Sequence, residues 1–304
     1  MASAVATANA FLPATDDILE TDIAVPMRDG YQAIARVRKP DSPSTEGGPL
    51  IILAFGGGWI AGDNNQMVVE ARALVRAFSA VVVNISYRLA PEHKFPQSWE
   101  DSWDNLVWLA THAPELGADP SNGFIMGGTS AGAGLTAVCA RKAQVEPLAY
   151  PLTGQWLNAP SILSDHQVPE KWKHLYVSKQ QNEHASILPS SALDILEKHT
   201  GWDFNSPWRS PLSSTHSLAG LPKTYTQVDG MDCLRDDGLL YDEMLKEAGV
   251  KTRCDLYAGC PHAHATFVPG KAAEKAHSDL VKNVGWMLGL ELDDGSVREV
   301  LRLV

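Results

Sequence analysis

One serine of this chain lies in a setting that suits a nucleophile. Ser130 is part of the stretch GGTSAGAG, with Gly128 two residues before it and Gly132 two residues after it. Apolar residues 124–126 lead into this stretch, and small residues 131–143 leave it with helical character. A sharp turn from a strand into a helix leaves no room for side chains at the two flanking positions and exposes the serine hydroxyl. The pattern therefore predicts a reactive serine if the chain also supplies a base.

Two later segments carry the groups that such a serine needs. A base must accept the hydroxyl proton, and a carboxylate must hold the base in the right tautomer. Asp232 follows one C-terminal apolar run and His262 follows the last, while His264 competes with His262 for the role of base. Asp229 is also near the acid position, and we interpret it as a strand-end cap. The carboxyl ends of parallel strands share one edge, so we expect these groups to meet there.

A triple glycine, Gly56, Gly57 and Gly58, directly follows the buried apolar run 50–55. Glycine lets a substrate approach the backbone closely, and backbone N–H groups stabilise the oxyanion of a tetrahedral intermediate. Losing one such donor typically raises the barrier by about 2.7 to 4 kcal/mol. We therefore interpret this segment as an oxyanion-binding loop rather than as a plain flexible connection.

Strands and helices alternate along the chain, which predicts an α/β fold with a mostly parallel sheet and helices on both faces. The expected strands are 22–26 and 31–38, joined as a hairpin, and then 50–55, 80–85, 124–126, 152–157, 224–228 and 254–257. The expected helices are a short one at 16–21 and then 67–78, 98–113, 191–199, 237–248 and 272–288. Segment 158–221 is too long for one connection and is expected to be a lid or a binding element.

Composition bounds the class of protein. The chain has 304 residues, 44% of them hydrophobic, and a net charge of −11, which argues against nucleic acid or an anionic membrane as a partner. No run has the length of a membrane span, and the N-terminus lacks the features of a secretory signal, so a cytoplasmic protein is expected. Four cysteines without a C-x-x-C pair fit reduced thiols. Cys254 and Cys260 lie near His262 and His264, but no second cluster completes a metal site, so we expect neither metal nor cofactor.

Five motifs in order carry a family resemblance, namely FGGGW (55–59), YRLAPEHKFPQ (87–97), GTSAGAG (128–134), DGMDCLRDDG (229–238) and YAGCPH (257–262). From about residue 22 to its C-terminus the chain resembles the hormone-sensitive-lipase-like (family IV, carboxylesterase-like) α/β-hydrolases. The resemblance implies that Ser130 is the nucleophile, Asp232 the acid and His262 the base, selected over His264 by the Tyr-x-Gly-x-x-His spacing. It also implies an oxyanion hole formed by Gly57, Gly58 and the N–H group of Ala131.

The chain departs from the family pattern at several positions. Phe55 replaces the usual His before the glycines, so we expect an intact oxyanion hole with altered bracing of the loop. Thr129 replaces a frequent Asp, which also happens elsewhere in the family, and Ala263-His264 replaces the usual Gly-Phe after the base. Other residues receive structural interpretations: Arg88 and Glu92 as braces of loops near the elbow, and Asp236 and Asp237 as a solvated helix start.

The resemblance implies one α/β-hydrolase domain over residues 1–304, with a cap formed by residues 1–21 and 160–220. Trp202 and Trp208 of the insertion are expected either in the core of the cap or lining a pocket. We expect hydrolysis of small or medium acyl esters or aromatic esters through an acyl-enzyme. The alternatives are a non-hydrolytic elimination or cyclisation enzyme and a ligand-binding receptor. The family also suggests a homodimer that pairs through the edge strand.

Overall fold

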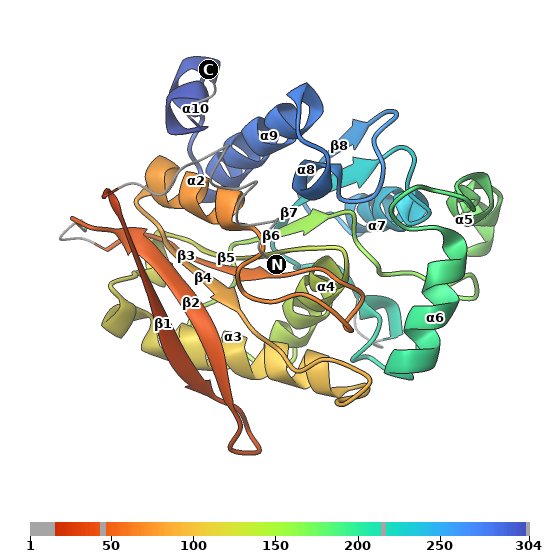
Figure 1. Cartoon of the computed structure of the whole chain (residues 1–304), viewed down its shortest axis with the longest axis horizontal. Coiled ribbons are helices and arrows are strands. Elements are labelled where there is room, and N and C mark those ends of the chain that lie inside the picture. The colour runs from red at the N-terminus through yellow and green to blue at the C-terminus, as the bar shows by residue number, and fades with distance from the viewer. Residues whose placement is uncertain (1–15, 43–46, 214–216, 302–304) are drawn as a thin grey trace.

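The computed structural model describes residues 16–42, 47–213 and 217–301. Its sheet has eight strands in the order β1-β2-β4-β3-β5-β6-β7-β8 (Figure 1). Strand β2 pairs antiparallel with β1 and β4, and all other neighbouring pairs of this sheet are parallel. The strands are β1 (Ile18–Pro26), β2 (Gln32–Pro40), β3 (Leu50–Ala54), β4 (Val81–Ile85), β5 (Phe124–Thr129), β6 (Gly154–Asn158), β7 (Lys223–Asp229) and β8 (Thr252–Tyr257).

The helices lie between and after these strands. They are α2 (Val68–Phe78), α3 (Gln97–Leu116), α4 (Ala131–Ala143), α5 (Ser178–Gln181), α6 (Ser190–Thr200), α7 (Arg235–Glu247), α8 (His264–Phe267), α9 (Lys271–Leu288) and α10 (Asp294–Leu301). Short 3-10 turns occur at η1 (Pro120–Asn122), η2 (Glu170–Leu175) and η3 (Pro211–Ser213). Elements η2, α5, α6 and η3 belong to the long insertion between β6 and β7, and α5 and α6 lie to the right of the sheet in Figure 1.

Strand β3 shows why the central strands are continuously apolar. Leu50, Ile52 and Ala54 pack into the core beneath α3, whereas Ile51 and Leu53 pack into the opposite core beneath α2 and α9. Helices α4 and α7 lie on the same face as α3. Burying one such Leu or Ile side chain contributes about 1.5 to 3 kcal/mol, so a strand covered on both faces needs no polar residue. These two cores fix the sheet whose strand ends carry the candidate site.

The predicted α/β architecture is confirmed, and each expected strand is present with shifts of a few residues at its ends. The predicted helix at 16–21 is wrong. Residues from Ile18 onward belong to β1, where Ile18 pairs with Pro40 and Thr21 with Val37. Tertiary pairing with β2 decides this segment, whose local pattern is too short to distinguish strand from helix. Residues 1–15 of the predicted cap arm lie outside the described residues.

Two details of the helices also differ from expectation. Helix α3 passes through Pro114 and ends at Leu116, because proline in the last turn removes few helical hydrogen bonds and Gly117, with φ of +88°, provides the C-cap. Helix α10 had no counterpart among the predicted helices. Glu92, expected to brace loops near the elbow, is exposed.

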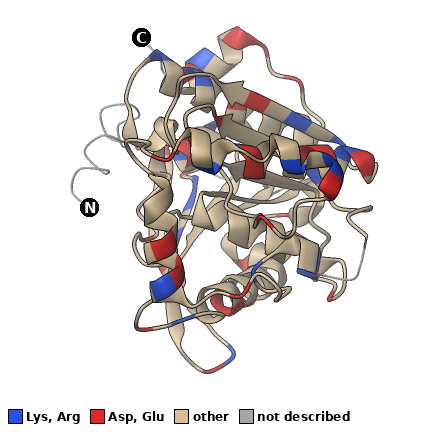
Figure 2. Cartoon of the chain, turned by 90° about the vertical axis from the view of Figure 1, so that its right-hand side faces the viewer, with Lys and Arg blue, Asp and Glu red and all other residues tan. Residues whose placement is uncertain are grey.

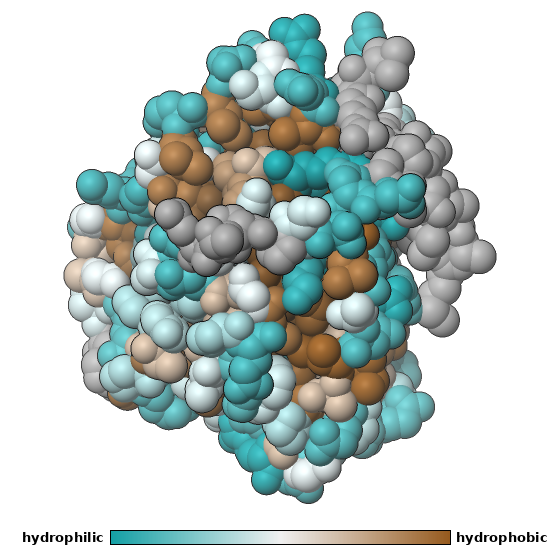
Figure 3. Space-filling view, turned by 90° about the vertical axis from the view of Figure 1, so that its left-hand side faces the viewer, coloured by the Kyte–Doolittle hydropathy of each residue, from teal (hydrophilic) through white to brown (hydrophobic). Residues whose placement is uncertain are grey.

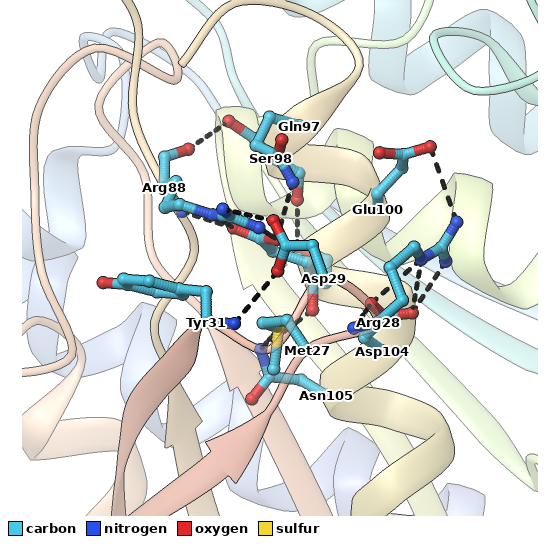
Figure 4. A network of polar contacts seen from close by, with 12 residues as sticks. Met27, Arg28, Asp29, Tyr31, Arg88, Gln97, Ser98, Glu100, Asp104 and Asn105 are labelled. Carbon is cyan, nitrogen blue, oxygen red and sulfur yellow. Dashed lines mark hydrogen bonds and ion pairs between the residues drawn. The ribbon is translucent and has the colours of Figure 1, made fainter. Parts of the chain in front are cut away.

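The predicted hairpin is confirmed, and its turn is bound to the body of the protein by two arginines (Figure 4). Arg28 donates from its side chain and backbone to Asp104 of α3, at 2.7 and 2.9 Å. Arg88 donates to Asp101 at 2.7 and 2.9 Å and to Asp29 of the turn at 2.7 Å. Arg88 is thus a structural residue, as expected, but it joins the hairpin, α3 and the loop after β4 rather than the loops near the elbow.

The face of the molecule on the β1 side mixes polar and apolar residues (Figure 3). Leu19 and Ile34, on the paired strands β1 and β2, are 42% and 45% exposed. In the described part of the chain, no helix is both long enough and apolar enough to cross a membrane.

Candidate active site

The turn from β5 into α4 places Ser130 in a strained backbone conformation, with φ of +56° and ψ of −116°. A Cβ at Gly128 would lie 2.4 Å from the carbonyl oxygen of Gly132, and a Cβ at Gly132 would lie 2.0 Å from that of Ala54. Both glycines are therefore required by close backbone contact, as the sequence predicts. The turn is held by a 2.8 Å hydrogen bond from the Ser130 N–H to the carbonyl of Asn158 on β6.

Ser130, His262 and Asp232 form one continuous chain of hydrogen bonds. Nε2 of His262 is 2.8 Å from Oγ of Ser130, and Nδ1 is 2.6 Å from Oδ2 of Asp232. The other carboxylate oxygen of Asp232 accepts the N–H of Leu234 at 2.9 Å, which fixes its orientation. His262 is 5% exposed and Asp232 is fully buried. The Nδ1 proton therefore faces the carboxylate, and Nε2 is free to accept the serine proton.

The electrostatic surroundings favour the protonated form of His262. Burial alone would lower the pKa of His262, but the charge of Asp232, its hydrogen bond and the charge of Asp229 outweigh burial and raise that pKa above its usual value. An imidazolium that forms during proton transfer from Ser130 is thus stabilised where it arises.

The loop after β3 presents backbone donors beside Ser130. Gly57 and Gly58 have φ of +125° and +63°, and both line the same cavity as Ser130 and Ala131. Within the described chain, the N–H groups of Gly57 and Gly58 donate to no backbone carbonyl. The N–H of Ala131 lies at the start of α4, where helical N–H groups lack intrahelical partners. All three predicted donors are thus brought to one cavity.

Phe55, which directly precedes this loop, is held in place by Tyr87. Its ring stacks on Tyr87, with centroids 4.1 Å apart and an interplanar angle of 10°. The Tyr87 hydroxyl donates to the backbone carbonyl of Phe55 at 2.7 Å. The side chain and the backbone of Phe55 are therefore both held by one residue of the YRLAPEH segment.

His264 does not compete for Ser130. Its Nδ1 is 2.6 Å from Oδ1 of Asp229, and its Nε2 is 3.3 Å from the carbonyl oxygen of Ala272 in α9. Asp229, the last residue of β7, thus binds His264. No group of three or more residues suited to a metal ion comes together in the described ranges, which include Cys254 and Cys260.

An apolar cavity of about 260 Å³ opens at Ser130. Helix α6 of the insertion and the residues before it form much of its wall. Its lining includes Ile187, Leu188, Ala192, Leu193 and Leu196 from the insertion, and Ile60, Leu234 and Phe267 from the body of the protein. The site therefore offers an uncharged space next to the candidate nucleophile.

A second cavity, of about 370 Å³, adjoins the first and shares Ser161, Leu193 and Leu234 with it. Trp202 lines this second cavity and packs edge-on against Trp59, which supports its predicted place at a pocket. Trp208 packs beneath Arg28 and Lys142 instead.

Arg209 is a buried cation at the junction of the insertion and the oxyanion loop. It is 1% exposed, and its guanidinium lies 4.7, 4.8 and 4.1 Å from the ring centroids of Trp59, Trp202 and Phe204. It donates to the carbonyl of Ser161 at 3.2 Å. Burial lowers the pKa of Arg209 to about 9. Because Trp59 directly follows Gly58, this aromatic cage links the insertion to the oxyanion loop.

Asp236 and Asp237 correct the prediction of a solvated helix start. Both are buried, 3% and 0% exposed, and both bind the insertion. Asp237 accepts hydrogen bonds from the backbone N–H groups of Ile162 and Leu163, both at 2.8 Å. It also accepts one from the Tyr176 hydroxyl at 2.7 Å. Asp236 accepts the N–H of Ser178 at 2.6 Å. On the side of the molecule that carries the insertion, charged residues of both signs are interspersed (Figure 2).

The fold and the Ser–His–Asp chain of hydrogen bonds at its strand ends together define a serine α/β-hydrolase. A family model described as alpha/beta hydrolase fold matches residues 51–266. The chain therefore belongs to the hormone-sensitive-lipase-like family of α/β-hydrolases, which includes carboxylesterases and other serine hydrolases.

Three relatives illustrate the range of similarity. The versiconal hemiacetal acetate esterase of Dothistroma septosporum is 33% identical over 80% of this chain and 75% of its own length. The structure of a vibralactone cyclase is 31% identical, with a TM-score of 0.85 over 94% of this chain and 86% of that one. A hyperthermophilic esterase from Pyrobaculum calidifontis is 29% identical, with a TM-score of 0.79 over 94% and 90% of the two chains.

The sequence did not indicate the Asp229–His264 pair, the caged Arg209 or the cavity wall that α6 shares with the oxyanion loop. The only sequence signal for the Asp229–His264 pair is that a second aspartate lies three residues from Asp232 and a second histidine lies two residues from His262. The other two depend on how the insertion folds back, which local patterns do not encode.

Proposed function

We propose that this chain hydrolyses carboxylic esters with small or medium acyl groups, or aromatic esters, through an acyl-enzyme. The observation that carries the proposal is the unbroken hydrogen-bonded chain from Asp232 through His262 to Ser130, which ends at an apolar cavity. Membership of a family of carboxylesterases supports the reaction class. A cavity of about 260 Å³ favours short or medium acyl chains.

In the proposed first half-reaction, Ser130 Oγ attacks the ester carbonyl while its proton passes to Nε2 of His262. The N–H groups of Gly57, Gly58 and Ala131 stabilise the oxyanion, and Asp232 stabilises the imidazolium. Collapse of the intermediate breaks the ester bond, and His262 gives its proton to the departing alcohol. In the second half, water attacks the acyl-enzyme, passes its proton to His262, and the acid leaves as Ser130 regains that proton.

The test is a panel of p-nitrophenyl esters from acetyl to palmitoyl, run on wild type and on Ser130→Ala. We expect turnover to be highest for short and medium chains and to fall roughly 10⁴- to 10⁶-fold in Ser130→Ala, with folding intact. Ser121→Ala, at an exposed serine, serves as control. Near-normal hydrolysis by Ser130→Ala, or efficient turnover of only the longest chains, would contradict the proposal.

Cyclisation is the second candidate, favoured by the likeness to a vibralactone cyclase at a TM-score of 0.85. The same acyl-enzyme yields a lactone when a hydroxyl of the acyl group replaces water as the attacking group. Reactions in oxygen-18 water distinguish the two outcomes, because hydrolysis places the label in the released acid and cyclisation places none in the lactone. The complete triad argues against a receptor that only binds a ligand.

A further inference from the structure

A second buried carboxylate–imidazole pair lies beside Asp232 and His262. Asp229, the last residue of β7, is three residues before Asp232, and His264, the first residue of α8, is two residues after His262. The Asp229 carboxylate contacts both the ring of His264, at 2.6 Å, and its backbone N–H, at 3.3 Å. Asp229 and His264 are 1% and 2% exposed. A carboxylate that binds both the ring nitrogen and the backbone N–H of the same histidine restrains the position of its backbone and the rotation of its ring.

The segment between the two histidines transmits this restraint. Ala263 has φ of +49°, a left-handed conformation that a residue with a side chain adopts only when its surroundings enforce it. The loops that follow β7 and β8 are also joined by backbone hydrogen bonds, from Gly230 to Tyr257 at 3.0 Å and from Met231 to Cys260 at 2.9 Å. The Asp229–His264 pair closes this junction on the far side of His262. The loop that carries the acid is therefore tied to the loop that carries the base on both sides of the base.

The groups around the pair explain why it does not itself react. His264 Nε2 faces the carbonyl of Ala272 rather than Ser130, and its ring lies 4.9 Å from that of Tyr257. The titratable or charged groups packed around the two histidines come from three elements. They are Asp229 at the end of β7 and Asp232 after it, Tyr257 at the end of β8 and Cys260 after it, and Lys275 and Asp279 of α9, which contact Tyr257. Asp229 is thus the carboxylate that binds His264 and whose charge also contributes to raising the pKa of His262.

We propose that Asp229 and His264 are positioning residues that hold His262 in line with Ser130. The proposal rests on the proposed function, in which His262 is the base. Two findings support it independently: the hydrogen-bond geometry above, and the contribution of Asp229, after burial and Asp232, to the raised pKa of His262.

The test compares Asp229→Asn, His264→Ala and His264→Asn in the full chain. We expect Asp229→Asn and His264→Ala to lower kcat about 10- to 100-fold with little change in KM, because misplacing a catalytic group by about 1 Å has effects of this size. His264→Asn should recover part of kcat, since its amide N–H can still donate toward Asp229. In Asp229→Asn the acid limb of kcat/KM should move to lower pH, because a charge that raises the pKa of His262 is removed.

Glu70→Gln provides the matched control. Glu70 and His277 form another buried carboxylate–histidine contact, at 3.3 Å between α2 and α9, away from the triad. Its variant should lose stability without any change in kcat or in the pH profile. If the Asp229 and His264 variants behave like Glu70→Gln, or if the acid limb stays in place in Asp229→Asn, the proposal is overturned. Should Asp229→Asn not fold, the difference between His264→Asn and His264→Ala decides.

A second readout separates this proposal from the proposed function. The rate at which a fluorophosphonate labels Ser130 depends on the serine–histidine geometry but not on ester turnover. If wild type is labelled and hydrolyses no ester, the proposed function fails, while the labelling rates of the variants still test the positioning pair. Unchanged labelling rates in Asp229→Asn and His264→Ala would refute the pair alone.

Discussion

The hydroxyl proton of Ser130 has a defined destination because each partner in the chain is itself oriented. The Leu234 N–H holds Asp232, Asp232 holds the Nδ1 side of His262, and Nε2 is then directed at Ser130. Burial of Asp232 makes its hydrogen bond insensitive to solvent, so a single tautomer of the base is favoured. This preorganisation is what a proton transfer at neutral pH requires.

The pH dependence follows from the raised pKa of His262. Neutral imidazole is the active base, so kcat/KM should rise with pH through an apparent pKa above the usual value of about 6.5. In Asp232→Asn, burial acts without the opposing carboxylate, and the acid limb of the residual activity should move to lower pH. We expect that variant to lose about 10⁴-fold in kcat. Asp294→Asn, at an exposed residue of α10, serves as the control and should leave the pH profile unchanged. An acid limb of kcat/KM that moves to higher pH in Asp232→Asn than in wild type would contradict this account.

Spacing around glycines predicted Ser130, because a nucleophile elbow leaves a strong local signature, and the family resemblance selected Asp232 and His262 among the candidates at the strand ends. The partner of His264 could not be assigned in the same way. Asp229 ends β7 and Asp232 follows it, and only the three-dimensional path of the two loops decides which aspartate meets which histidine. Asp236 and Asp237 were misassigned for a related reason: their partners lie in the insertion, some 60 to 75 residues away.

At the scale of elements, helix α6 of the insertion packs directly on the oxyanion loop. A Cβ at Gly58 would come within 2.4 Å of the Leu196 side chain, whereas a Cβ at Gly57 would come within 2.2 Å of the Ala61 backbone carbonyl. The first obstacle is a side chain and the second is main chain. The shape of this loop therefore depends partly on the insertion and partly on itself.

This difference predicts distinct rescue behaviour. Gly58→Ala should reduce ester turnover by about 10-fold or more, and Leu196→Ala in the same chain should restore part of it by making space. Gly57→Ala should lose about 10²- to 10³-fold, and Leu196→Ala should leave that loss unchanged. Steady-state kinetics of the two single variants and the two double variants check this. Equal rescue of both glycine variants would show that α6 does not discriminate between the two positions.

Element prediction succeeded where burial on two faces leaves an apolar run, as in β3, β4 and β5. It failed at Ile18–Thr21, where an edge strand alternates weakly and its pairing with β2 supplies the missing information. The insertion was recognised by its length, but its inner arrangement was not, because its residues are fixed by distant partners such as Asp237 and Trp59.

For the whole molecule, the net charge of −11 sets the conditions under which charged substrates reach the site. A surrounding negative potential repels anionic esters at low salt, and salt screens this repulsion over a Debye length of about 10 Å at 0.1 M. We expect kcat/KM for an anionic ester, such as a p-nitrophenyl monoester of succinate, to rise severalfold with added NaCl. The butyrate ester, being neutral, should show almost no change. A decrease with salt for the succinate ester would instead reveal a local positive site that dominates the net charge.

The insertion enters and leaves the fold between β6 and β7 and contributes no strand to the described sheet. Its attachment to the body of the protein includes Asp236 and Asp237 of α7, which bind backbone N–H groups of the insertion and, in the case of Asp237, also the Tyr176 hydroxyl. Because backbone N–H groups are present in almost any sequence, most of these bonds can form with an insertion of different sequence. Substrate range can thus diversify by exchange of one segment, and a graft of a relative's insertion between β6 and β7 should carry that relative's acyl preference with it.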